Sequence, residues 1–262
     1  MLVEREDNAK SGCRLEKITL FGLPLINADI EAVLLEIRNI QHAVFIAFMN
    51  AHCFNVLVGD REYNDALESA DYLLPDGIGV ELAARLRGKK LKANLNGTDF
   101  IPAFLGTMQA EKPSVFFLGA KPGIAERAAA RLQQEFPKLL VSGCWDGYGV
   151  AGTDAEAIEA INSSGADILL VAKGVPSQEI WISQHRGILR PKFIFGVGAF
   201  FDFWAGEVMR APSWLRRFRL EWLWRLAMEP RRMAYRYLVG NFVFMYRAVC
   251  DALQGRSYDL ER

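Results

Sequence analysis

The feature that most constrains the fold is a strand–turn–helix unit that recurs along the chain. Residues 114–136 read as an apolar strand, a turn containing glycine and an amphipathic helix, in that order. Residues 166–185 repeat this plan, and residues 192–206 begin it a third time. Strands that alternate with helical stretches of about 10 to 15 residues indicate βα units. We therefore expect a Rossmann-like α/β fold, in which helices cover both faces of a mainly parallel sheet.

Two further strands are expected earlier in the chain. Residues 43–49 (AVFIAFM) form a short apolar run, rich in aromatic and β-branched side chains, that suits a buried strand. Residues 72–74 (YLL) suit a second strand, and the turn at PDG leads from it into a helix expected over residues 78–86. Another helix is expected over residues 63–70, between the two strands.

The turns that follow these strands carry the candidate binding residues. Ligands of open α/β sheets bind outside the carboxyl ends of the strands. Amides and carboxylates gather in these turns, and together they suit a polyhydroxylated ligand such as a sugar. The candidates are Asn50, Asp76, Gln178 and Glu179 in these turns, with Asn96 and Asp99 in another loop.

A purely structural role is also open for several of these residues. Asp76 lies in the stretch LLPDGIGVE, where a buried and unpaired carboxylate would cost free energy. It would serve either as the N-cap of the helix from Ile78 or as a group kept for chemistry. Asn96 and Asp99 suit an Asx turn in a loop, and Glu179 would favour the dipole of a helix that starts beside it.

Two glycine turns resemble part of a dinucleotide-binding fingerprint. FLGAKPG at 117–123 and GVGAFF at 196–201 lack the third glycine of G-x-G-x-x-G, so neither supports NAD binding by itself. Their N–H groups near helix N-termini would suit a phosphate or diphosphate. A metal site is not expected, because no D-x-D pair occurs and the three histidines are isolated. We expect no other cofactor either.

The charge of the chain is balanced overall but not along its length. The 31 basic residues match 31 acidic ones, which argues against nucleic acid as a partner. Between Arg210 and Arg247, however, there are nine arginines and only two acidic residues. We therefore place a boundary near residue 210, with an α/β domain over residues 1–209 and a basic, helical, membrane-associating appendage over residues 210–262.

The pattern within this appendage has two interpretations. Tryptophans beside arginines are typical of an interfacial helix on anionic lipid, whereas a helix packed on its own domain with a solvated basic face would look the same. The longest late apolar run, residues 237–246, has 10 residues against the roughly 20 needed to span a bilayer. Four large apolar side chains recur at helical spacing and predict an amphipathic helix that ends before Pro230: Leu215, Phe218, Trp222 and Leu226.

The N-terminus and the cysteines indicate the compartment. The first 17 residues are charged and lack the apolar core of a signal peptide. The four cysteines have no C-x-x-C spacing, which argues against a zinc site and against a disulfide framework. A reducing cytoplasm is therefore expected.

Taken together, the motifs resemble those of the WecG/TagA/CpsF glycosyltransferases. The resemblance rests on PDGIGV, NGTDF, FFLGAKPG, ADILLVAKGVPSQEIWI, GVGAFFDFWAG, RAP and LEWLWRLAMEPRR, and it runs from about residue 17 to residue 247. It implies transfer of a sugar from a UDP-sugar to a polyprenyl-diphosphate-linked saccharide, in cell-wall or exopolysaccharide biosynthesis and without a metal ion.

The resemblance also implies roles for individual residues. Asp76 matches the aspartate of the P-D-G-x-G motif, which is proposed as the general base. Asn50 matches the asparagine of the T-x-N motif in the sugar pocket, and Gln178 matches the glutamine of the P-x-Q-E motif. Arg225 and Arg232 match basic residues of a C-terminal appendage that would close over the site and hold the acceptor diphosphate at the membrane.

The sequence also departs from the family pattern. Phe48 stands where the T-x-N motif has threonine, and Asn94 stands where an arginine is common. Ser177 replaces a frequent lysine, and Ala199 replaces a usual glycine. Because Phe48 and Asn94 would lie near the donor pocket, either an N-acetylmannosamine-type sugar or glucose is expected as the donated group.

We therefore expect an inverting glycosyltransferase that is peripheral on the cytoplasmic face of the membrane, with an anionic membrane surface as a partner. Exposed helices of this kind also favour a homo-oligomer. Two alternatives from other classes stay open. The glycine turns would be the evidence for a nucleotide-binding oxidoreductase, and the basic tail would be the evidence for a non-catalytic peripheral membrane module.

Overall fold

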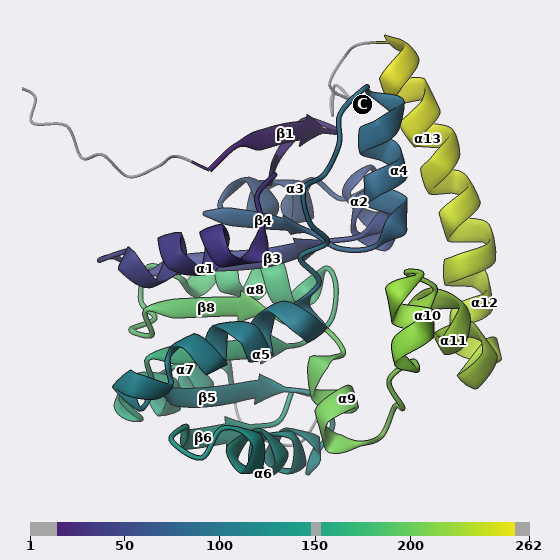
Figure 1. Cartoon of the computed structure of the whole chain (residues 1–262). Helices are drawn as coiled ribbons and strands as arrows, with labels where there is room; N and C mark the ends of the chain where they lie inside the picture. The colour runs from purple at the N-terminus through teal and green to yellow at the C-terminus, as the bar shows by residue number, and fades with distance from the viewer. Residues whose placement is uncertain (1–14, 148–152, 255–262) are drawn as a thin grey trace, which may run out of the picture.

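The computed structural model describes residues 15–147 and 153–254. Its centre is a six-stranded sheet with the order β4-β3-β8-β7-β5-β6, in which all neighbouring strands are parallel (Figure 1). The mainly parallel sheet expected from the βα units is thereby confirmed. The strands are β3 (Val44–Met49), β4 (Tyr72–Pro75), β5 (Ser114–Gly119), β6 (Leu140–Trp145), β7 (Ile168–Ala172) and β8 (Phe193–Gly196).

Helices cover both faces of this sheet, as the sequence predicts. Alternate residues of β3 point to opposite faces, so that Phe48 belongs to one apolar cluster and Met49 to the other. Side chains of α1, α5, α6 and α9 complete the first cluster, and those of α2, α3, α4, α7 and α8 complete the second. These helices are α1 (Ile30–Asn39), α2 (Ala51–Leu57), α3 (Arg61–Glu68), α4 (Ile78–Leu86), α5 (Gly97–Thr107), α6 (Ile124–Glu135), α7 (Asp154–Ser163), α8 (Ser177–His185) and α9 (Phe200–Ala205), with a 3-10 turn, η1, at Gln109–Glu111.

An N-terminal hairpin lies outside the βα pattern and was not identified in the sequence. Its antiparallel strands are β1 (Lys17–Leu20) and β2 (Leu23–Ile26). The two connecting residues, Phe21 and Gly22, both have positive φ angles, of 50° and 82°. Such a turn matches the twist of a two-residue hairpin, and glycine tolerates it without strain. Phe21 is nonetheless buried, because its ring packs on Phe54 of α2.

The C-terminal segment, residues 210–254, is helical but is not one continuous amphipathic helix. Arg219 has a positive φ of 59° and separates the first two helices, so the expected stripe from Leu215 to Leu226 is broken there. Pro230 begins the third helix, where a missing N–H costs little. The elements are α10 (Ser213–Arg217), α11 (Glu221–Met228), α12 (Pro230–Ala234), a π-helical turn, η2 (Tyr235–Val239), and α13 (Gly240–Gln254).

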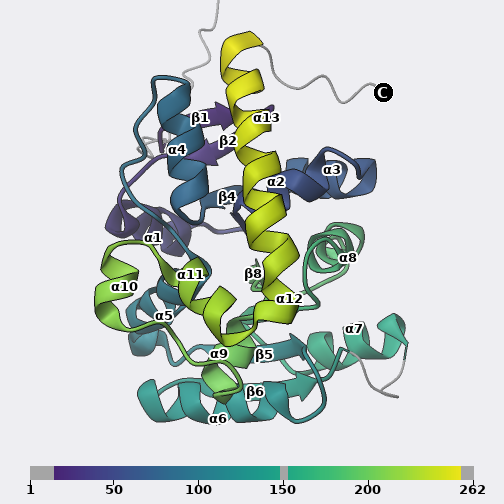
Figure 2. The same cartoon turned by 90° about the vertical axis from the view of Figure 1, so that its right-hand side faces the viewer.

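The segment returns to the body through α13. Figure 2 shows α13 running across α2 and α4, and α13 packs against both of these helices. Phe244 and Ala248 of α13 are buried in the same cluster as the sheet residues. No helix among the described residues is both long enough and apolar enough to cross a membrane.

Candidate functional site

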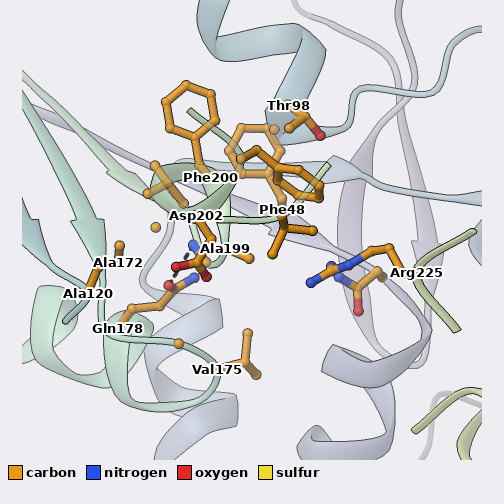
Figure 3. Close-up of a pocket in the computed structure, with 18 of the residues that line it drawn as sticks. Phe48, Thr98, Ala120, Ala172, Val175, Gln178, Ala199, Phe200, Asp202 and Arg225 are labelled. Carbon is orange, nitrogen blue, oxygen red and sulfur yellow. Dashed lines mark hydrogen bonds between the residues drawn. The ribbon is translucent and has the colours of Figure 1, made fainter. Parts of the chain in front are cut away.

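A pocket of about 710 Å³ opens at the carboxyl ends of the parallel strands. This volume lies within the range of small-molecule sites, roughly 300–1,000 Å³. The turns after β3, β4, β5, β7 and β8 contribute to its wall, and so do α11 and α12. In Figure 3, Gln178 and Arg225 point toward the cavity from opposite sides. The sheet edge predicted from the sequence is therefore the place where the structure forms a pocket.

Asp76 lines this pocket, directly after β4. The alternative role as a helix cap is wrong, because Gly77 occupies the N-cap of α4 and no side chain caps that helix. The turn is held instead by the backbone N–H of Gly77, which donates to the Asn94 side chain over 2.7 Å. Asn94 therefore supports the turn beneath Asp76 and is not itself among the lining residues.

The surroundings of Asp76 change its acidity. Burial raises the pKa of its carboxyl from 3.8 to about 6, a hydrogen bond with Asn50 opposes the shift, and the Glu221 carboxylate adds to it. The Arg236 and Arg225 guanidinium groups lower the pKa again, so the shift stays moderate. A carboxylate with a pKa near neutrality that faces a cavity can accept a proton at physiological pH.

Asn50 is fixed by the start of the next helix. Its side-chain oxygen accepts hydrogen bonds from the N–H groups of His52 and Cys53, at 3.0 and 3.3 Å, and thereby caps α2. The amide nitrogen is then the group left to donate toward Asp76. Asn50 and Asp76 follow adjacent strands, and the structure brings them together as the sequence predicts.

Gln178 and Glu179 begin α8, but only Gln178 lines the pocket. The Gln178 amide donates to the Glu179 carboxyl over 2.7 Å and accepts from the Gly198 N–H over 2.9 Å. Glu179 is 1% exposed and lies beneath Gln178. Burial raises its pKa to about 8, against the opposing effect of the Gln178 hydrogen bond. The Gly198 N–H is consequently engaged, although the glycine turns were expected to present such groups to a phosphate.

Asn96 and Asp99 lie at the start of α5, whereas the sequence pattern predicts a loop there. Asn96 is the N-cap of that helix and accepts from the Asp99 N–H over 3.0 Å. Neither residue is among those that line the pocket, whereas Gly97 and Thr98 between them are. The Asp99 carboxylate instead faces Arg210 and Arg216 of the C-terminal segment.

Three arginines of the C-terminal segment line the pocket: Arg225, Arg232 and Arg236. The Arg225 guanidinium lies 5.1 Å from the centre of the Phe203 ring, in a cation–π arrangement. Arg232 pairs with Glu229 over 3.1 Å. Arg236 was not selected from the sequence, although it belongs to the arginine-rich stretch that was. Burial, aided by Arg236, lowers the pKa of the neighbouring His52 to about 4, so this imidazole is neutral at pH 7.

Phe48 and its neighbours form an aromatic part of the wall. Its ring lies at the end of β3 and meets the Phe100 ring edge to face, with centroids 6.0 Å apart. A Cβ atom on Gly97 would lie 3.2 Å from this ring, so the glycine allows α5 to approach it closely. Phe48 thus presents an apolar surface where a threonine would present a hydroxyl, which distinguishes this site from the T-x-N pattern.

The described residues hold no group of three or more histidine, cysteine, aspartate or glutamate side chains arranged to bind a metal ion. The positive groups of the pocket are side chains, namely Lys121 and the three arginines. The arrangement offers a carboxylate that can take a proton, amides that can bind hydroxyl groups, and guanidinium groups that can hold phosphate oxygens.

Comparison with known proteins agrees with this chemistry. The chain is 32% identical over 218 residues to the N-acetylglucosaminyldiphosphoundecaprenol N-acetyl-beta-D-mannosaminyltransferase of Bacillus subtilis (strain 168). The aligned region covers 82% of this chain and 84% of that protein. The enzyme of the same name from Bacillus spizizenii is 37% identical over 199 residues, or 76% of this chain and 77% of its own. That from Staphylococcus aureus (strain MRSA252) is 26% identical over 252 residues, or 94% and 95%. The sequence profile of the glycosyl transferase WecG/TagA/CpsF family matches residues 18–258, and the chain therefore belongs to this family.

Proposed function

We propose that this glycosyltransferase moves a sugar from a UDP-sugar to a saccharide linked to polyprenyl diphosphate, with inversion at the anomeric carbon. The names of its relatives support this acceptor class, because those enzymes act on N-acetylglucosaminyl-diphospho-undecaprenol. They also support an N-acetylmannosamine donor, and glucose is the alternative because Phe48 replaces a hydroxyl-bearing residue in the pocket wall. This activity would serve bacterial cell-surface or exopolysaccharide biosynthesis.

The observation that carries the proposal is the Asp76 carboxyl, which lines the pocket and has a pKa raised to about 6 by burial. In its charged form it takes the proton from the acceptor hydroxyl, whose oxygen attacks the anomeric carbon of the donor. The bond from that carbon to the diphosphate breaks, and UDP leaves with the electron pair. General-base assistance of this kind contributes a factor of about 10²–10⁴.

The arginines at the pocket supply charge for the phosphates. Arg225 lines the side opposite Gln178, and Arg232 also lines the pocket. Planar guanidinium groups bind phosphate oxygens in pairs. They would stabilise the leaving UDP or position the acceptor diphosphate, which is electrostatic work that a metal ion performs in other transferases. Asn50 and Gln178 offer amide groups to the sugar hydroxyls.

We also propose that the C-terminal segment is a membrane-associating appendage to the α/β body of residues 1–209. Interfacial helices combine aromatic and aliphatic side chains with arginine. Arg217 and Arg231 of this segment are exposed. So are several large apolar side chains: Trp214, Phe218, Leu223, Met228, Leu238 and Phe242. Vesicle co-sedimentation tests this point: the double variant Trp214→Ser/Phe218→Ser is expected to bind anionic vesicles less than wild type, and equal binding would contradict the proposal.

Self-association of the protein is a separate prediction, which analytical ultracentrifugation tests.

The proposed activity is tested by transfer assays with UDP-N-acetylmannosamine and UDP-glucose, on polyprenyl-diphosphate-linked N-acetylglucosamine. We expect turnover by the wild type with an acid limb near pH 6, because protonated Asp76 cannot accept the proton. The Asp76→Asn variant should lose about 10²–10⁴-fold in kcat, whereas UDP binding measured by calorimetry should persist. The matched control is Asp65→Asn, which changes an exposed aspartate of α3.

Each alternative function predicts a different outcome. Near-wild-type turnover by a folded Asp76→Asn protein would remove the general-base role. Quenching of NADH fluorescence without UDP binding would indicate an oxidoreductase. Vesicle binding without consumption of any UDP-sugar would indicate a non-catalytic membrane module.

A further inference from the structure

Ion pairs gather where residues 210–221 meet the body of the protein. Asp99 of α5 pairs with Arg210 over 2.5 Å and lies 3.7 Å from Arg216. The other side of the Arg210 guanidinium lies 3.9 Å from the Glu221 carboxylate, at the start of α11. Glu81 of α4 pairs with Arg219. Two helices of the body thus each hold the segment that leads into α11.

We propose that Asp99 and Glu81 are positioning residues, which clasp residues 210–221 to the body and thereby set Arg225 in the pocket. The proposal rests on the function proposed above, since Arg225 is there assigned to the phosphates. It gives Asp99 a role other than the sugar binding that the sequence pattern predicts for it. Below, these contacts are called the clasp: Asp99–Arg210, Asp99–Arg216, Arg210–Glu221 and Glu81–Arg219.

The geometry links the clasp to the pocket through one short helix. Glu221 and Arg225 are four residues apart on α11, so their side chains lie on the same face, about one turn from each other. Arg210 lies between the carboxylates of Asp99 and Glu221 and offsets their repulsion. If Arg210 were released, α11 would lose this link to α5, and the guanidinium of Arg225 would keep its contact with Phe203 but would be held less firmly relative to Asp76.

The burial of these residues separates positioning from folding. The side chains of Asp99 and Arg210 are 49% and 32% exposed, and ion pairs this exposed add little to folding stability. Burial would raise the pKa of Asp99, but hydrogen bonds with Asn96 and Arg210 outweigh it and lower the pKa, so the carboxylate is charged at neutral pH. The rest of the C-terminal segment is anchored elsewhere, by the burial of Phe244 of α13. Leu215 of α10 is buried as well, so loss of the clasp should loosen α10 and α11 without unfolding the protein.

The test reverses the charge of Asp99 in the full-length protein. Asp99→Arg places a third positive charge beside Arg210 and Arg216, and we expect a fall of about 10- to 100-fold in kcat/KM for transfer, the loss that corresponds to a misplaced charged contact. Trypsin should also cut the arginine-rich residues 210–232 several-fold faster than in wild type. Asp65→Arg, the same change at an exposed aspartate of α3, should alter neither quantity.

The double variant Asp99→Arg/Arg210→Asp restores the opposite-charge pair between these two positions but leaves like charges beside Glu221 and Arg216, so it should recover part of the protection against trypsin and part of kcat/KM. A purely local structural role for Asp99 would not produce this recovery. If Asp99→Arg does not fold, Asp99→Asn combined with Glu81→Gln removes the same contacts without adding charge, and the same two measurements apply to it.

Two results would overturn the inference: trypsin cleavage and kcat/KM equal to those of Asp65→Arg, or losses that the double variant leaves unchanged. Failure of the proposed function is distinguishable from both. It would show as absence of transfer by the wild type, while the cleavage assay, which needs no substrate, would still report whether the clasp holds the segment.

Discussion

The two walls of the pocket are built and held in different ways. The sheet-edge wall carries Asn50, Asp76 and Gln178, which follow buried parallel strands or begin a helix packed on them. The C-terminal wall carries Arg225 and Arg232 on short helices, held by exposed ion pairs and by the distant packing of α13. The first wall supplies a proton acceptor and amides, and the second supplies positive charge.

In the proposed mechanism, this difference would divide the work of transfer between the two walls. Groups that must keep an altered pKa, such as Asp76, require a rigid and partly dry environment, which the sheet edge provides. The phosphates that we propose Arg225 and Arg232 to hold require charge and reach, which arginines on a peripheral segment provide. A wall of the second kind would also adjust to the proposed lipid-linked acceptor without disturbing the proposed base.

The largest effect is expected from Phe244→Ala, which removes the buried ring that anchors the C-terminal wall to the body. Phe244 is 1% exposed, and its ring packs against both the Phe21 ring and the Phe54 ring, with centroid distances of 5.7 and 5.8 Å. Removing a buried phenylalanine costs about 3–5 kcal/mol of unfolding free energy. Chemical denaturation measures this loss. Phe242→Ala is the matched control, because Phe242 of the same helix is 75% exposed.

Equal unfolding free energies for the two phenylalanine variants would contradict the view that buried packing of α13 anchors the C-terminal wall. They would mean that α13 is not docked in solution, so that the whole C-terminal segment would be peripheral. A large difference would show instead that residues 240–254 belong to the folded core, although their composition places them with the basic appendage.

Much of the sheet-edge wall was predictable from the sequence. Asn50 and Asp76 end short apolar strands, and a residue that ends a parallel strand reaches the binding edge whatever packs around it. The helix expected over residues 78–86 has the same bounds in the structure. The same local logic placed Gln178 in the pocket. Glu179 is not among the lining residues: both residues are buried, and only the packing of α8 decides which of two neighbours at a helix start faces the pocket.

The C-terminal wall was harder to predict, because its contacts join residues that are far apart in the sequence. The partners of Asp99 lie more than 100 residues away, at Arg210 and Arg216, and no local pattern indicates this pairing. Arginine content identified the segment but did not distinguish Arg236, which lines the pocket, from Arg217, which does not. Similarly, the hairpin β1–β2 has no Asn-Gly or Asp-Gly turn to reveal it.

An intermediate effect is expected from Arg225→Gln, which removes positive charge from the C-terminal wall and leaves its anchor intact. Hydrogen bonds to charged groups contribute about 1.5–3 kcal/mol, which corresponds to a loss of about 10- to 100-fold in kcat/KM. Steady-state transfer assays measure it. Arg231→Gln changes an exposed arginine that does not line the pocket and should have little effect. Equal losses in both variants would show that only the overall charge of the segment matters.

The smallest effect is expected from Glu179→Gln, which changes a buried carboxyl behind the sheet-edge wall and thereby the pH dependence of the unfolding free energy. Burial raises the pKa of Glu179 from 4.5 in the unfolded chain to about 8 in the folded protein. The folded state therefore holds a proton that the unfolded state releases between these two values, and this contribution to stability is complete below pH 4.5 and is lost as the pH rises to 8. Glutamine cannot titrate. Relative to wild type, the variant should gain up to about 1.4 kcal/mol of unfolding free energy from pH 6 to pH 7.

Denaturation at both pH values measures the gain, and Glu159→Gln, at an exposed position of α7, should show none. A gain near zero for Glu179→Gln would mean that water or a counter-charge reaches this carboxyl, so that the sheet-edge wall would be as open as the C-terminal one.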